Sequence, residues 1–128
     1  MAKDRTFKLN KLVRDKIVPD HVKNGAKVSH HRLSKQDKIK ALAAKIIEEI
    51  TEGTDLAELA DVQEALDQIT KDQGFTKEQV AAEQAAKRAK NGGFENGDFI
   101  DTETWRADHK WAKYYAAEPD RFPEVKSE

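Results

Sequence analysis

Residues 34–73 read SKQDKIKALAAKIIEEITEGTDLAELADVQEALDQITKDQ, and this stretch decides the fold. Apolar residues recur with the 3.6-residue period of a helix on both sides of Gly53, which predicts one helix over about 35–52 and another over about 55–72. The connection is so short that the two helices must be antiparallel neighbours. The side chains expected to face inward are Ile39, Leu42, Ala43, Ile46 and Ile50 on the first helix and Leu56, Leu59, Val62, Leu66 and Ile69 on the second.

Capping signals set the limits of these helices. Ser34, followed by Asp37, is typical of an N-cap, and Thr54 is expected to cap the second helix. Thr76 with Gln79 forms a capping box that predicts a third helix, which runs to about Lys90.

The remaining segments carry weaker patterns. Residues 9–16 are compatible with a helical turn or two, and Pro19 is expected to open a short helix that ends at Asn24-Gly25. Residues 26–33 favour a short strand, and 94–101 either a loop or a second short strand. A C-terminal helical piece is marked by Trp105, Trp111, Tyr114 and Tyr115. The sequence therefore predicts an all-α fold, an antiparallel bundle of about four helices with short strands as an optional addition.

Bulk composition narrows the class of protein. The chain has 128 residues, of which 37% are charged and none is cysteine. We expect one soluble, cytoplasmic domain over residues 1–128, because the sequence shows neither a membrane-spanning stretch nor a signal peptide. A small helical unit with a modest core often completes that core by self-association.

Charge is distributed unevenly along the chain. Residues 1–40 hold 12 Lys and Arg against 4 Asp and Glu, whereas residues 41–75 hold 2 against 9. This arrangement suits a ligand that carries both phosphates and metal ions, and it equally suits internal charge balance. The net charge of −1 argues against a nucleic-acid partner.

Two acidic groups flank the break at Gly53. Glu48, Glu49 and Glu52 fall within about 100° of each other around the first helix. Glu58 and Asp61 are about 60° apart on the second helix, and Glu58 lies in its apolar stripe. A carboxylate in that position is costly unless a cation compensates it, so a divalent metal is one interpretation. A solvated acidic face is the other.

Short motifs in a fixed order carry a family resemblance. They are LVRDKIVP at 12–19, EEITE at 48–52, ELAD at 58–61, and Lys87-Arg88 followed by NGGF at 91–94. Over roughly residues 9–101 the chain resembles the all-α nucleoside triphosphate pyrophosphohydrolases, the MazG-like and phosphoribosyl-ATP pyrophosphohydrolase-like group. The resemblance implies a helical, usually oligomeric protein that holds Mg²⁺ on acidic residues from two helices. Residues 102–128 are an extension that it does not cover.

Residue by residue, the resemblance assigns roles to the acidic and basic motifs. It implies metal ligands at Glu49, Glu52, Glu58 and Asp61, for Mg²⁺ or alternatively Mn²⁺. Glu48, together with Glu49, is expected to orient or deprotonate the attacking water. Phosphate groups of the substrate are expected to meet basic side chains. Those candidates are Lys11, Arg14, Lys87 and Arg88.

The expected reaction is hydrolysis of a nucleoside triphosphate to its monophosphate and pyrophosphate, in clearing non-standard nucleotides. Phosphoribosyl-ATP hydrolysis in histidine synthesis is an alternative, although Ile47 stands where that branch typically has a glycine before the paired glutamates. A non-catalytic helical interaction or nucleotide-binding protein is a third possibility. The expected partners are a nucleotide and further copies of the chain, in a homodimer or homotetramer, without a membrane.

Overall fold

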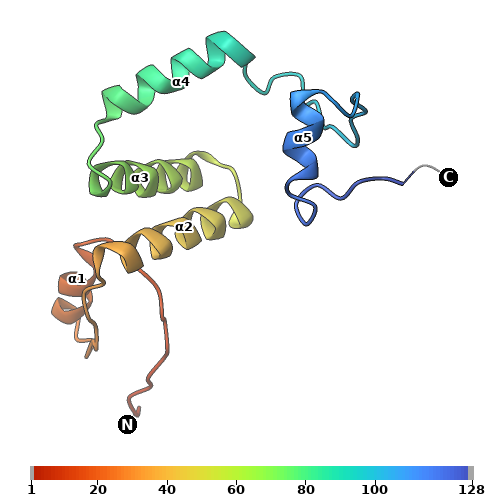
Figure 1. Ribbon diagram of the computed structural model, residues 1–128. Coiled ribbons are helices and arrows are strands. Elements are labelled where there is room, and N and C mark those ends of the chain that lie inside the picture. Colours follow the sequence, from red (N-terminus) through yellow and green to blue (C-terminus); the bar gives the residue numbers. More distant parts are fainter. Residues whose placement is uncertain (1, 127–128) are drawn as a thin grey trace. The chain divides into compact units, whose positions relative to one another are not determined.

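The computed structural model describes residues 2–126, and all regular structure in that range is helical (Figure 1). The all-α class is therefore confirmed. The chain divides into two compact units, one up to Asn91 and the other from Gly92 onward. The first unit contains α1 (Ile17–Lys23), α2 (Lys35–Glu52), α3 (Leu56–Asp72) and α4 (Lys77–Asn91), and the second contains α5 (Lys110–Ala116). None of the described helices has the length and apolar character needed to cross a membrane.

An antiparallel hairpin of α2 and α3 forms the centre of the first unit (Figure 1). Ser34 Oγ accepts a hydrogen bond from the Asp37 amide at 3.2 Å, which confirms the predicted N-cap of α2. The cap of α3 is Asp55, whose Oδ1 accepts from the Glu58 amide at 3.1 Å. The prediction of Thr54 as that cap was wrong by one residue, because Asp and Thr are both good caps and only the backbone path selects between them.

The seam between α2 and α3 differs from the predicted apolar stripes. Leu42 and Ala65 are its buried apolar side chains, and Glu49 is buried with them. On each helix the buried positions lie roughly 80° around the axis from the centre of the apolar stripe. Several residues predicted to face inward are consequently exposed, namely Ala43, Ile50, Leu56, Leu59 and Leu66.

The hairpin has an open apolar face, because the apolar stripe of each helix is rotated away from the seam. Because α2 and α3 are antiparallel, the same rotation turns both apolar stripes to the same side of the pair. We define the open apolar face by its three large exposed members, Ile50, Leu59 and Leu66, which are 42%, 47% and 44% exposed. The seam also contains charged pairs: Lys38 Nζ lies 2.8 Å from Asp72 Oδ2.

The segment before α2 is less regular than expected. α1 begins at Ile17, whose amide donates to the Arg14 carbonyl, so Pro19 lies within its first turn rather than opening it. Proline is tolerated there because the amides of a first turn have no partner in the helix. Residues 26–33 are exposed and form no strand, contrary to prediction, since no described segment pairs with them.

α4 begins with the predicted capping box. The Thr76 amide donates to Gln79 Oε1, and the Gln79 amide donates to Thr76 Oγ1. In the second unit, residues 94–101 form a loop, which was one of the two predicted alternatives. Aromatic rings gather around α5, where Trp111 stacks on Tyr115 and Tyr115 meets Phe122 edge to face. Trp105 precedes that helix and stacks on His109.

Candidate functional site

The candidate site begins with Glu49, in the last turns of α2. Its residue surface is only 8% exposed, which is unusual for a carboxylate, because this position lies on the seam with α3. Lys45, one turn earlier, places its Nζ 3.4 Å from Glu49 Oε1. This ammonium partly compensates the buried charge.

Glu58 lies in the first turn of α3 and folds back over the connection. A β-carbon built on Gly53 would lie 3.2 Å from Glu58 Oε1, so the bare glycine provides the room for this carboxyl group. Glu58 Oε2 is buried and has no hydrogen-bond partner among the described residues. A buried, unpartnered carboxylate oxygen is costly, and a cation would remove that cost.

Asp61, one turn further along α3, is bound by an arginine from the N-terminal segment. Arg14 Nη2 donates to Asp61 Oδ1 at 2.6 Å, and the two side chains are 56% and 39% exposed. The contact joins positions 47 residues apart in the chain. The structure thus brings together one residue predicted to bind phosphate and one predicted to bind metal.

The other two predicted acidic residues lie apart from the seam. Glu48 and Glu52 are both exposed on α2. Because Glu49 is the member of EEITE that faces α3, its neighbours at other angles around the helix point toward solvent. Near the connected ends of the hairpin, Glu49 is thus buried and Glu58 and Asp61 are half-buried, whereas Glu48 and Glu52 at the same end of α2 are exposed.

These residues fit Mg²⁺ in the chemistry of their donors. All are carboxylates, the ligand type that Mg²⁺ prefers, and Glu58 supplies an oxygen without a partner. They are not gathered into a complete cage, because no group of three or more acidic or histidine side chains within residues 2–126 is close enough to hold a metal. Mg²⁺ commonly completes its shell with waters and substrate phosphates, so a full protein cage is not required.

The predicted phosphate-binding residues are distributed over the first unit. Arg14 reaches one of the acidic motif residues, through its contact with Asp61. Lys11 lies exposed before α1, and Lys87 and Arg88 lie exposed on α4. All four side chains are exposed to solvent.

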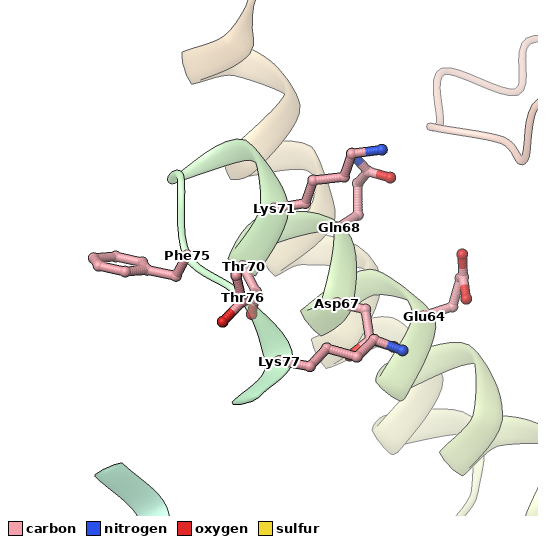
Figure 2. A pocket seen from close by; sticks show the side chains of 8 residues that line it. All are labelled: Glu64, Asp67, Gln68, Thr70, Lys71, Phe75, Thr76 and Lys77. Atoms are coloured by element: carbon pink, nitrogen blue, oxygen red, sulfur yellow. The ribbon is translucent and has the colours of Figure 1, made fainter. Parts of the chain in front are cut away.

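A cavity of about 390 Å³ lies elsewhere, at the turn between α3 and α4 (Figure 2). Its lining includes Asp67 and Lys77, whose Nζ lies 3.0 Å from Asp67 Oδ2. The hydrogen bond to Lys77, with a second from Gln63, holds the pKa of Asp67 below its ordinary value. The same contact raises the pKa of Lys77. This cavity lies toward the opposite end of α3 from Glu58, and it contains none of the predicted site residues.

Sequence reasoning missed three contributors to the acidic site. The Lys45–Glu49 pair has a readable signal, since the two residues are four positions apart on one helix. The roles of Gly53 and of the Arg14–Asp61 contact depend on tertiary placement and have no local signature. No protein-family model, curated protein or solved structure matches this chain.

Proposed function

We propose that this chain is a Mg²⁺-dependent nucleoside triphosphate pyrophosphohydrolase, also active with Mn²⁺, that removes non-standard nucleotides. It would cleave the α–β phosphoanhydride and release a monophosphate and pyrophosphate. The observation that carries the proposal is the buried, unpartnered oxygen of Glu58. Glu49 is buried in the same seam, and Asp61 follows Glu58 by one turn of α3. The order of motifs in the sequence supplies the reaction class.

Each residue of the site has a defined part in this proposal. Glu49, Glu58 and Asp61 would hold the metal, with Glu52 as a further ligand from the end of α2. Glu48 and Glu49 would orient the attacking water and accept its proton. Bound Mg²⁺ supplies positive charge that offsets the negative charge developing on the phosphates. Arg14, Lys11, Lys87 and Arg88 would bind the phosphate oxygens outside the metal shell.

The assembly belongs to the same proposal. We infer a bundle of the all-α pyrophosphatase type in which a second copy of the chain covers the open apolar face, in a homodimer or a homotetramer. Ile50, Leu59 and Leu66 support this inference, because large side chains of this kind gain free energy when they leave water.

The test is product analysis by phosphorus NMR with a panel of standard, deoxy and modified nucleoside triphosphates. At least one should yield its monophosphate and pyrophosphate in the presence of Mg²⁺. Asp61→Asn should reduce turnover by at least about 100-fold with the helical content retained, as expected for loss of an essential electrostatic group. Glu64→Gln, an exposed carboxylate on the same helix, is the matched control and should retain activity. Orthophosphate and a diphosphate as products would refute the proposal.

A further inference from the structure

Arg14 is held by the backbone in a position from which it reaches Asp61. The Ile17 amide donates to the Arg14 carbonyl at 3.1 Å and closes a turn directly before α1. Leu12 and Val13, the two residues before Arg14, are half-buried although most of the N-terminal segment is exposed. The guanidinium therefore lies at the end of an anchored segment.

The contact between Arg14 and Asp61 is short and charge-assisted. Nη2 and Oδ1 are 2.6 Å apart, so the guanidinium occupies one lone-pair direction of that oxygen. A divalent cation bound to either Asp61 oxygen would stand within a few ångströms of a second positive charge and be repelled by it. The single negative charge of Asp61 cannot fully neutralise the guanidinium and the divalent cation together.

We propose that Arg14 is the resident counter-ion of Asp61 in the metal-free protein and that a divalent metal must displace it to use Asp61 as a ligand. This inference rests on the proposed function. Arg14 and the metal then compete for one carboxylate, and the intrinsic affinity of the site for metal is higher than its apparent affinity. A displaced guanidinium remains tethered beside the site by the turn at Arg14–Ile17, where an anion can meet it.

The expected change in metal affinity depends on how exposed the Arg14 and Asp61 side chains are. Both side chains of the pair are more than one third exposed, and ion pairs of this kind contribute only modestly because solvent screens them. Loss of the competitor should therefore tighten metal binding by about two- to fivefold rather than by orders of magnitude.

The experiment is a calorimetric titration of the full chain with Mn²⁺ alone, at low ionic strength and without nucleotide. Arg14→Gln should bind Mn²⁺ about two- to fivefold more tightly than the wild type. Arg14→Lys should return toward the wild-type affinity, because it restores a cation. Lys8→Gln is the matched control: it removes one exposed positive charge from the same segment, and it should change the affinity by less than Arg14→Gln does.

A second readout follows the arginine itself. In ¹⁵N spectra the Nε–H signal of Arg14, assigned by its loss in Arg14→Lys, should shift when diamagnetic Mg²⁺ is added to saturation. An unchanged signal would overturn the inference, and so would Mn²⁺ binding to Arg14→Gln that is equal to or weaker than wild type.

Asp61→Asn separates this inference from the proposed function. If Asp61→Asn weakens Mn²⁺ binding while Arg14→Gln leaves it unchanged, the metal role of Asp61 stands and only the counter-ion role of Arg14 fails. If neither substitution changes Mn²⁺ binding, or if the wild type binds none, the metal site fails and the counter-ion role fails with it.

Discussion

Gly53 shows how a residue without a side chain makes room for a neighbouring carboxylate, that of Glu58. The carboxyl group folds back over the α2–α3 connection and comes within 3.2 Å of where a β-carbon on Gly53 would stand. Contacts at that distance are tighter than ordinary van der Waals separation, so any larger residue at 53 must push the carboxylate outward. Gly53 itself has an extended backbone, with φ 166° and ψ 176°, which other residues also adopt.

We therefore predict that Gly53→Ala displaces the Glu58 carboxylate and leaves the helices intact. Mn²⁺ binding, measured by calorimetry, should weaken severalfold, while the circular dichroism spectrum should match that of the wild type. Thr54→Ala, in the same connection and exposed, is the control and should retain the wild-type affinity. Unchanged Mn²⁺ binding in Gly53→Ala would show that the position of Glu58 does not matter to the metal.

At the scale of the elements, the ends of the helices are fixed by side-chain caps. Ser34 caps α2 through a single hydrogen bond to the Asp37 amide. We predict that Ser34→Ala lowers the free energy of unfolding by about 1 kcal/mol, because one amide of the first turn loses its partner. Urea denaturation provides the measurement. Ser29→Ala, in the exposed segment before α2, should change stability by less than half as much.

The limits of α2, α3 and α4 could largely be predicted from sequence, because caps and breaks act over three or four residues. The exception is the cap of α3, where the backbone path selects Asp55 over Thr54. Outside these helices, the strand expected at 26–33 was also wrong. That strand depended on a partner segment, which local pattern cannot supply. The orientation of α2 and α3 about their axes was predicted only in part: of the ten residues expected to face inward, five are buried or half-buried and five are exposed. Periodicity locates an apolar stripe but not the side of it that meets a neighbour.

In the candidate site, too, local features could be predicted from the sequence, whereas contacts between elements could not. Glu58 was predicted to lie in the apolar stripe of α3, and it is half-buried with Oε2 enclosed because it lies on the side of that stripe nearest the seam. The separation of Glu49 from Glu48 and Glu52, and the arrival of Arg14 at Asp61, depend on how the elements pack. No spacing rule covers two residues that are 47 positions apart.

The turn between α3 and α4 should respond to pH through Asp67 and Lys77. The folded-state pKa of Asp67 is lowered, so its stabilising contribution is complete above about pH 4 and is lost as pH falls through the lower folded value. The pKa of Lys77 is raised, so its contribution is complete below about pH 10 and is lost as pH rises through the higher folded value.

Lys77→Gln is accordingly predicted to destabilise the protein at pH 7 and to lose this effect as the pH falls through the lowered pKa of Asp67, because the carboxylate then becomes protonated. Denaturation of both proteins across this range measures the difference. Lys71→Gln, which alters another lysine of the same cavity, should show no such convergence with the wild type. A penalty for Lys77→Gln that stays constant down to pH 2 would contradict the assigned ion pair.

At the scale of the whole molecule, the open apolar face predicts self-association. Leu66→Gln should shift sedimentation toward the monomer, because it removes an apolar side chain from that face without opening a buried cavity. Ile47→Gln is the control: Ile47 is 69% exposed and lies outside the apolar stripe, on the side of α2 away from the seam, so it should leave the assembly unchanged. A wild-type chain that sediments as a monomer at every accessible concentration would exclude this role.

The small buried core also determines how stability varies with temperature. Leu42 and Ala65 are the buried apolar side chains among residues 2–126, so unfolding of a single copy newly hydrates little apolar surface. Its heat-capacity increment should fall below the usual ~12–15 cal/mol/K per residue. The stability curve of the separated chain is then shallow and its calorimetric transition broad. Covering the open apolar face would deepen that curve and sharpen the transition.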